Sequence, residues 1–293
     1  METNQPKKNY TSKVWIVKSL IFAVIFIFLF INLSYLFRPI QINRTNIVGL
    51  AAEPKNSIDM LYIGGSSTFV YWAPMQAWEE EGITSYNFAG NTMSPALLKP
   101  MLQEGLKVQD PKLIVIDLRA FPRRDAIPYE EENIRSFTDF LPYSLNRAKA
   151  IEKAISLGEA NKKNRLQLHL DLVTYHGNWK NISKEQFQYA DNQFTSYSRG
   201  FYLVPETVKQ PLPTVSNLSE KETLSEETNL LLLELLDYCK TLDKEFLFIV
   251  NPYVLDEKSQ KQYNYIGSIV EEYGIQYLNT NYYYDEKGLD FTP

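Results

Sequence analysis

Short apolar runs alternate with amphipathic segments along most of this chain, and the alternation limits the folds it can adopt. The apolar runs suited to buried strands cover residues 58–63, 83–88, 112–118, 246–250 and 275–278. The helical patterns between them cover residues 74–81, 94–108, 225–240 and 257–273. Strands that alternate with helices are typical of a parallel sheet with helices on both faces. The sequence therefore predicts an α/β domain with a parallel five-stranded sheet between two helical layers.

The first predicted strand ends in a turn that is rich in hydroxyl groups. Residues 58–63 lead into two glycines, which Ser66, Ser67 and Thr68 follow. In open parallel sheets, ligands and reacting groups lie at the carboxyl ends of the strands, so a serine on a tight turn there can act as a nucleophile. Ser66 is the candidate nucleophile. The structural alternative is an ordinary glycine turn followed by a serine helix cap.

The residues around this turn resemble the first sequence blocks of the SGNH (GDSL-type) hydrolases. The residues that carry the resemblance are Gly64, Gly65, Ser66, Pro74, Trp78 and the run from Gly82 to Asn87. Membrane-anchored, acyl-esterase-like members of Gram-positive bacteria are similar in layout. Gly65 stands where the family has an acidic residue, and Ser67 is a second candidate nucleophile if the register shifts by one. The resemblance implies a flavodoxin-like, three-layer SGNH domain over residues 57–293.

Composition and charge exclude several other classes of protein. The chain has 293 residues, of which 44% are hydrophobic, so a large core is possible. Its net charge of −5 argues against a nucleic-acid partner, because phosphate binding needs a clustered basic surface. With the single Cys239 and two histidines, no metal-ligand spacing occurs. A dinucleotide fingerprint is also missing, so we expect neither a cofactor nor a metal.

An apolar run near the amino terminus is long enough to cross a membrane. Residues 14–37 hold about the 20 apolar residues that a spanning helix needs, with Trp15 and Tyr35 near the two ends. Lysines come before the run, which predicts a single-pass cell-membrane anchor with residues 1–13 as a cytoplasmic tail. Residues 38–56 then form a juxtamembrane linker to an extracytoplasmic domain. A cleaved signal peptide is the first alternative, although no small-x-small cleavage site follows, and a buried soluble helix is the second.

The regular pattern loosens between residues 122 and 222. This stretch is polar, aromatic and proline-containing, with one helical piece at residues 144–158. Long insertions in compact domains are usually functional or form lids, so we expect it to lie over the carboxyl edge of the sheet and to select the substrate. The alternative is a peripheral helical elaboration that only packs against the domain.

Ser66 and nearby hydrogen-bond donors can together form a site for acyl transfer. This reaction needs an activated hydroxyl and hydrogen-bond donors where the tetrahedral oxygen becomes negative. In the resemblance, Ser66 is the nucleophile, and the backbone N–H groups of Ser66 and Gly90 form the oxyanion hole. The Asn91 side chain is a possible third donor, because the family's asparagine after the third strand is absent here. A turn asparagine without such a role is the alternative for Asn91.

The general base is the missing part of this site. SGNH hydrolases carry an Asp and a His two residues apart after the fifth strand, and this chain stops at Pro293, where that block is expected to begin. The only histidines are His169 and His176, both inside the insertion. A lone histidine is more often structural than catalytic. The chain therefore looks truncated at its carboxyl end, or resembles a degenerate member of the family.

The sequence supports two hypotheses about function. The first is a membrane-anchored, extracytoplasmic serine acyl esterase or acyltransferase that acts on a cell-envelope glycopolymer or an acylated carbohydrate. Proteins of D-alanyl-lipoteichoic acid biosynthesis are similar in layout, so the resemblance implies a membrane acyltransferase as a partner beside the bilayer. The alternative is a noncatalytic, membrane-anchored scaffold or glycan-binding protein that keeps the SGNH fold without its base.

Overall fold

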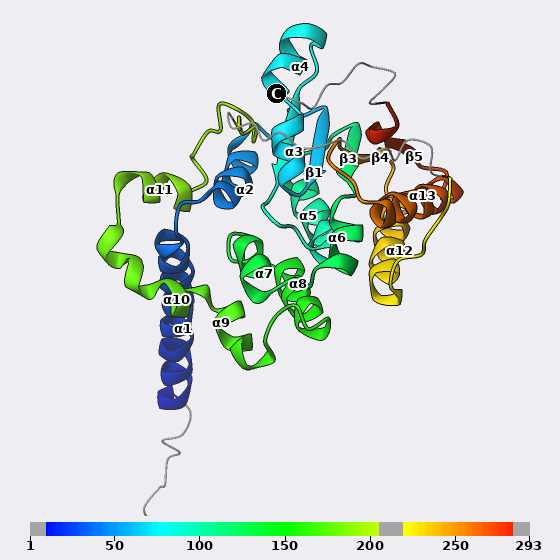
Figure 1. Ribbon diagram of the computed structural model, residues 1–293. Helices are drawn as coiled ribbons and strands as arrows, with labels where there is room; N and C mark the ends of the chain where they lie inside the picture. Colours follow the sequence, from blue (N-terminus) through cyan, green and yellow to red (C-terminus); the bar gives the residue numbers. More distant parts are fainter. Residues whose placement is uncertain (1–9, 205–218, 284–293) are drawn as a thin grey trace, which may run out of the picture.

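A parallel sheet of five strands forms the centre of the molecule (Figure 1). The computed structural model describes residues 10–204 and 219–283. The strands are β1 Met60–Gly64, β2 Ser85–Ala89, β3 Leu113–Asp117, β4 Glu245–Val250 and β5 Gln276–Asn279. Their order across the sheet is β2-β1-β3-β4-β5, and every neighbouring pair is parallel. The predicted α/β class and the five-stranded parallel sheet are confirmed.

Helices connect the strands and extend beyond them. Their bounds are α1 Tyr10–Phe37, α2 Ile42–Ala52, α3 Ser66–Tyr71, α4 Pro74–Glu81, α5 Pro95–Val108, α6 Ala120–Ala126, α7 Glu131–Thr138, α8 Leu145–Ser156, α9 Arg165–His169, α10 Asp171–Tyr175, α11 Lys184–Ala190, α12 Glu226–Lys240 and α13 Glu257–Glu272. Short 3-10 turns are η1 Lys162–Asn164, η2 His176–Asn181 and η3 Thr280–Tyr283. The four predicted helices between strands correspond to α4, α5, α12 and α13.

Local signals explain where these predicted helices begin and end. The Ser94 and Ser225 side chains cap α5 and α12 by accepting hydrogen bonds from the backbone N–H groups of Ala96 and Thr228. Gly82 ends α4 in the left-handed region, with φ 69°. A residue with a Cβ is disfavoured in that conformation, which explains why the helix stops at this glycine.

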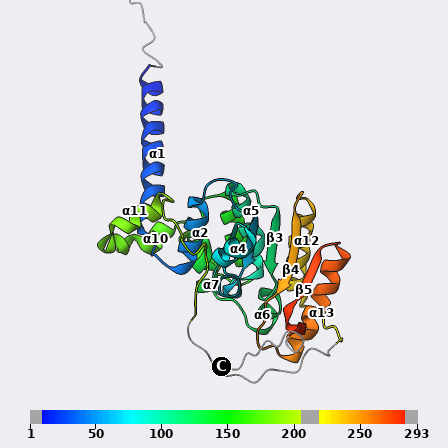
Figure 2. The same cartoon turned by 90° about the horizontal axis from the view of Figure 1, so that it is seen from above.

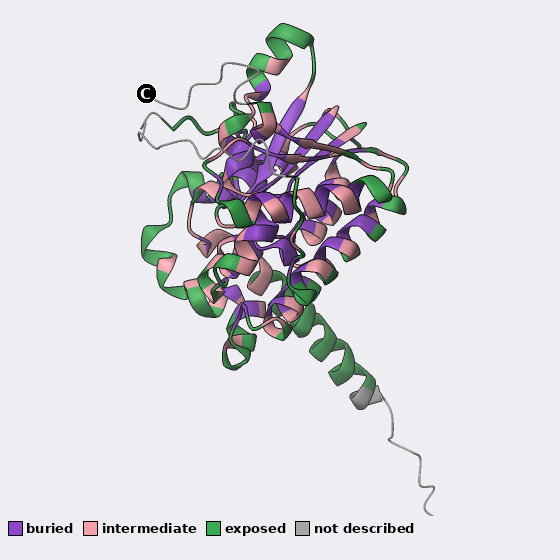
Figure 3. Cartoon of the chain, turned by 45° about the vertical axis from the view of Figure 1, so that its right-hand side comes forward, coloured by how far each residue is buried: buried purple, intermediate pink, exposed green. Residues whose placement is uncertain are grey.

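The main hydrophobic core lies on one face of the sheet. Leu61, Ile63, Ile116 and Phe248 point from the strands into a cluster with apolar residues of α5, α12 and α13. A smaller cluster of Met60, Tyr62 and Val115 lies on the other face, where Trp72 packs against it. Figure 3 shows the strands as the most buried part of the chain. Side chains buried on both faces of β1 and β3 explain why these strands read as continuous apolar runs, whereas Leu247 and Ile249 of β4 are only partly buried on the second face.

Helix α1 projects away from the sheet and its helices (Figures 1 and 2). Residues Lys13–Phe37 form a helix that is long and apolar enough to span a membrane by length and composition. The side chains of its first half are exposed, whereas its last turns contact α10, η2 and α11. The spanning length predicted for residues 14–37 is therefore present. Residues 1–9 of the predicted cytoplasmic tail lie outside the described part of the chain.

Two segments are more structured than the sequence indicated. The segment 38–56, predicted as a linker, contains α2, whose Ile47 and Leu50 belong to the main core. The described part of the insertion 122–222 holds α7 and α9–α11 in addition to the expected helix around α8. Helices α10 and α11 contact α1, while residues near Arg199 return to the sheet, where its carbonyl accepts a hydrogen bond from the Asn87 N–H at 3.0 Å. The insertion therefore reaches both α1 and the sheet.

The strand order creates a crevice at the carboxyl ends of β1 and β3. The chain passes from β1 outward to β2 and then crosses back over β1 to β3, so the direction of the connections reverses between these two strands. Ligands bind at such switch points in open α/β sheets, because the connecting loops diverge there. Ser66 follows β1, and Arg119 follows β3, so both residues lie at this crevice.

Candidate active site

A close approach of strand ends positions Ser66. A Cβ atom on Gly64 would lie 2.3 Å from Thr68 Oγ1 and 2.6 Å from Asp117 Cβ, so only glycine fits at the end of β1. Gly65 is extended and precedes α3, which makes Ser66 the first residue of that helix. The first N–H groups of a helix have no intrahelical acceptor. The Ser66 N–H therefore has no acceptor within α3 and can donate to a group outside the helix.

The three hydroxyl residues of this turn have different surroundings. Ser67 and Thr68 are buried, with exposures of 1% and 0%, whereas Ser66 is partly exposed. The Ser67 hydroxyl donates a short hydrogen bond to Asp117 Oδ2. In the described part of the chain, the Ser66 hydroxyl has no hydrogen-bond partner. Ser66 is thus the accessible hydroxyl, while Ser67 contributes to the support of the turn.

Asp117 holds the base of the crevice together. It ends β3, is 1% exposed, and accepts hydrogen bonds from the Ser67 hydroxyl and from the Arg119 N–H at 3.0 Å. Burial raises the pKa of the Asp117 carboxyl above its usual range, although these two donors favour its charged form. The buried Asp117 carboxyl therefore holds the Ser67 hydroxyl and the Arg119 N–H in place from below the surface of the crevice.

Two hollows meet at Ser66. The smaller one has a volume of about 170 Å³ and is lined by Gly65, Thr92, Arg119 and Arg123 among others. The larger one, of about 450 Å³, is lined by Asn91, Tyr202 and Val204 among others. Ser66 and Arg119 line both hollows. Tyr202 and Val204 of the insertion therefore form a wall beside the serine.

The crevice carries positive charge. The Arg119 guanidinium lies over the Tyr253 ring at 4.2 Å from its centroid, and that of Arg123 lies over Tyr129 at 5.2 Å. Neither arginine forms an ion pair with a carboxylate of residues 10–204 or 219–283. Two guanidiniums beside a serine favour a substrate or an intermediate that carries negative charge.

Of the predicted oxyanion donors after β2, the Gly90 N–H already has a partner, whereas Asn91 is engaged through its backbone N–H and not through the predicted side-chain amide. The Gly90 N–H donates to the Gly64 carbonyl at 3.2 Å, and the Asn91 N–H donates to Asn43 Oδ1 at 2.8 Å. A Cβ at Gly90 would lie 2.8 Å from Met93 Cε, which explains the glycine by packing. The Asn91 side chain is exposed in the larger hollow with Ser66. The oxyanion roles of Ser66, Gly90 and Asn91 stay predictions.

The two histidines lie in a different part of the molecule. His169 Nε2 is 2.7 Å from Glu152 Oε1, and His176 Nδ1 is 2.8 Å from the Val173 carbonyl. They belong to α9 and η2, near α8 and α1, whereas Ser66 begins α3 beside the sheet (Figure 1). Neither histidine is brought to Ser66. Residues 284–293, before the expected Asp and His block, lie outside the described residues.

Sequence reasoning missed the charged groups of the crevice. Asp117 ends the third strand, and Arg119 and Arg123 follow it as Ser66 follows the first, so the same rule about carboxyl ends applies to them. Tyr202 carries no comparable signal, because it reaches the site from an irregular part of the insertion. No group of three or more potential metal ligands occurs in the described residues.

Comparison with known proteins does not assign a function to this site. No family model, no curated protein and no solved structure matches this chain.

Proposed function

We propose that the chain is a membrane-anchored, extracytoplasmic serine acyl esterase or acyltransferase of the SGNH type, with Ser66 as its nucleophile and a cell-envelope glycopolymer as its substrate. The observation that carries the proposal is the position of Ser66. It is the partly exposed hydroxyl at the switch point of a parallel sheet, it lies where two hollows meet, and Arg119 lines both of them. The anchoring helix α1 and the resemblance around Ser66 support the location and the reaction class.

In the proposed reaction, the Ser66 hydroxyl oxygen attacks the carbonyl carbon of an ester. The carbonyl oxygen becomes negative, and N–H donors at the start of α3 stabilise it, with Arg119 adding positive charge nearby. The ester C–O bond then breaks, and the leaving alkoxide takes up the proton that the Ser66 hydroxyl has lost and departs as the alcohol. The acyl group stays on Ser66 Oγ until the oxygen of water or of an acceptor hydroxyl attacks it and the proton returns to Ser66. Ser67 and Asp117 act as positioning residues, because their hydrogen bond fixes the turn.

A noncatalytic glycan-binding protein or scaffold is the second candidate, and one observation favours it. Both histidines are engaged elsewhere, by Glu152 and by the Val173 carbonyl. The carboxylate nearest to the serine turn, Asp117, is hydrogen-bonded to Ser67 instead of activating Ser66. A serine without a general base keeps only the rate that binding and oxyanion donors provide.

Labelling with a fluorophosphonate probe separates the two candidates. The full chain is treated in neutral detergent, and the modified peptide is identified by mass spectrometry. We expect the label on Ser66 and no label on Ser66→Ala. Ser67→Ala should label more slowly than the wild type but still at Ser66, because it loses a positioning hydrogen bond and keeps the nucleophile. His169→Ala and His176→Ala should also keep the label, because those side chains lie elsewhere. A folded but unlabelled wild-type chain would reject the enzyme and favour the scaffold.

A further inference from the structure

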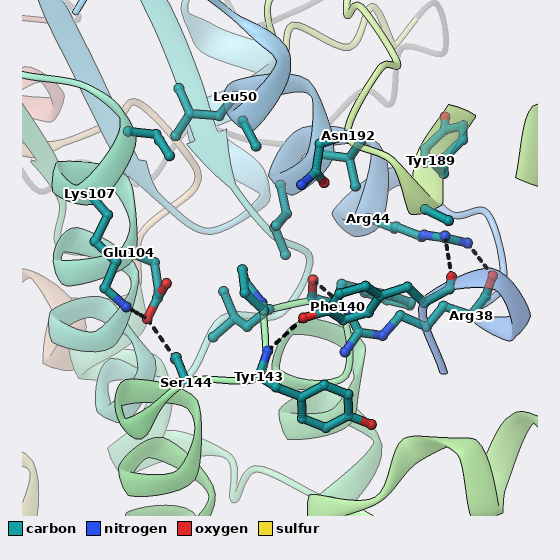
Figure 4. Close-up of a pocket in the computed structure, with 18 of the residues that line it drawn as sticks. Arg38, Arg44, Leu50, Glu104, Lys107, Phe140, Tyr143, Ser144, Tyr189 and Asn192 are labelled. Atoms are coloured by element: carbon teal, nitrogen blue, oxygen red, sulfur yellow. Dashed lines mark hydrogen bonds and ion pairs between the residues drawn. The ribbon is translucent and has the colours of Figure 1, made fainter. Parts of the chain in front are cut away.

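A second cavity lies at the end of α1, away from Ser66. It has a volume of about 280 Å³, close to the lower end of ligand pockets, which span about 300–1,000 Å³. Its walls come from the last turn of α1, from α2, α5 and α11, and from residues 140–144. Arg38 and Arg44 lie at one end, and Glu104 and Lys107 at the other (Figure 4).

The middle of this cavity is apolar. The side chains there include Ile47, Leu50, Val108 and Leu141. At the far end, Glu104 is neutralised by Lys107, whose Nζ lies 2.6 Å from its Oε1, and also accepts a hydrogen bond from Ser144. The cavity therefore offers an apolar channel with one charge-balanced end.

Arg44 is a buried cation without a counter-ion. Its guanidinium donates to three neutral oxygens, namely the carbonyls of Tyr35 and Arg38 and the Gln186 side-chain oxygen. It is 1% exposed and forms no ion pair with any described carboxylate. Burial and the neighbouring Arg38 lower its pKa to about 10, so the group stays charged at neutral pH.

Arg38 beside it is only partly satisfied. Its Nε lies 2.6 Å from Asp171 Oδ2, and its Nη1 donates to the Phe140 carbonyl at 3.2 Å. Its Nη2 is buried and has no partner in residues 10–204 or 219–283. Asp171 also faces Arg147 at 3.9 Å, and Asp139 faces Arg147 at the same distance. These two carboxylates therefore serve Arg38 and Arg147, and neither forms an ion pair with Arg44. This end of the cavity carries excess positive charge.

A purely structural role for Arg44 leaves that charge uncompensated. Its hydrogen bonds to Tyr35 and Arg38 join the end of α1 to α2, and the carboxyl end of α1 supplies about half a negative charge through its dipole. A buried guanidinium needs a full counter-charge, because removing it from water is costly. An anion at this end would supply the charge and a partner for Arg38 Nη2.

We propose that this cavity binds an anionic membrane phospholipid, with its phosphate at Arg38 and Arg44 and the first part of an acyl chain along the apolar walls. The phosphate accepts charge-assisted hydrogen bonds from guanidinium groups. The location fits such a ligand, because the cavity adjoins the last turn of a helix long and apolar enough to span a bilayer. The inference stands independently of the reaction proposed at Ser66.

The test measures lipid binding by the full chain in neutral detergent. Dioleoyl phosphatidylglycerol, dioleoyl phosphatidylcholine and inorganic phosphate are added separately, and native mass spectrometry and thermal unfolding report binding. We expect one phosphatidylglycerol per chain and a raised melting temperature with that lipid alone. Arg44→Gln should weaken binding at least about tenfold, the change that one lost charged contact of about 1.4 kcal/mol produces. The matched control Arg165→Gln, at an exposed arginine outside the cavity, should leave binding unchanged.

Two further variants keep the proposal testable if Arg44→Gln does not fold. Ala51→Leu and Ala190→Leu add three carbons each to partly exposed walls of the cavity and leave both arginines in place. At least one of them should lower phosphatidylglycerol binding in a folded chain. Equal binding of phosphatidylcholine, an equal effect of phosphate alone, or full phosphatidylglycerol binding in all of the folded cavity variants would overturn the proposal.

Discussion

At the residue scale, the hydrogen bond between Asp117 and Ser67 decides which hydroxyl of the turn faces solvent. Ser67 is drawn below the surface by the carboxylate, and the next residue toward β1, Ser66, is left partly exposed. The sequence reasoning kept Ser67 as a second candidate because glycine and serine runs do not fix a register. Because Ser67 is buried and Ser66 is partly exposed, a substrate can reach the Ser66 hydroxyl more easily. Burial of Asp117 raises the pKa of its carboxyl, and this shift makes the stability of the chain depend on pH.

The first prediction concerns how the contribution of Asp117 to stability changes with pH. Burial raises the pKa of Asp117, so the folded chain binds more protons than the unfolded chain between about pH 3.9 and the raised value. The contribution of Asp117 to the free energy of unfolding therefore falls as the pH rises through this window. Asp117→Asn removes this dependence, so the stability of the wild type relative to the variant should decrease as the pH rises. Denaturant unfolding of both chains from pH 4 to pH 8 measures it.

Asp59→Asn is the matched control, with the opposite sign. Hydrogen bonds from Thr84 and then Lys112 lower the pKa of Asp59, so its stabilisation is present above about pH 3.9 and is lost as the pH falls through the lowered value. The stability of the wild type relative to this variant should rise with pH only below about pH 3.9, so it should stay nearly constant from pH 4 to pH 8. The same slope for both variants would contradict the assigned environment of Asp117.

At the scale of elements, the sequence predicted what local signals determine. Strand β3 follows from four consecutive branched apolar residues, 113–116, and α12 from the Ser225 cap and its leucines. Helix α2 was missed, because its buried face includes polar groups such as Asn43 and Arg44, whose hydrogen-bond partners lie outside the helix. The short helices α9–α11 were also missed, because contacts with other elements hold them and not their own periodicity. Helices α10 and α11 contact α1, and α9 contacts α8 and α10.

The central strand gives the second prediction. Ile116 is 0% exposed and lies between β1 and β4, so Ile116→Asp would bury a carboxylate without a partner. Such changes exceed about 4 kcal/mol, a large part of the 5–15 kcal/mol that stabilises a domain. We expect this variant to be insoluble or unfolded by circular dichroism. Gln276→Asp, at the exposed start of β5, should fold normally. A cooperatively melting Ile116→Asp chain would place β3 away from the centre.

At the scale of the whole molecule, the candidate site was predictable in part. Ser66 follows from the general rule that parallel strands carry function at their carboxyl ends, and the structure places it at such a crevice. The groups around it come from β3, α6 and the insertion, and their meeting depends on strand order, which a strand pattern alone does not fix. The cavity at Arg38 and Arg44 also had no sequence signal, because it joins segments more than a hundred residues apart.

The last prediction concerns the orientation of the molecule across a membrane. The length and apolar composition of Lys13–Phe37 suit a span, and the lysines before it favour a cytoplasmic amino terminus. We therefore expect the sheet domain to lie outside the cell. The test uses single cysteines in a Cys239→Ser background, which removes the native buried thiol. A bulky maleimide that does not cross membranes should label Lys55→Cys, at an exposed position, in intact cells. A cysteine at Thr3 should react only after the cells are opened. Labelling of Thr3→Cys in intact cells, with Lys55→Cys protected, would reverse the topology and with it the proposed extracytoplasmic substrate.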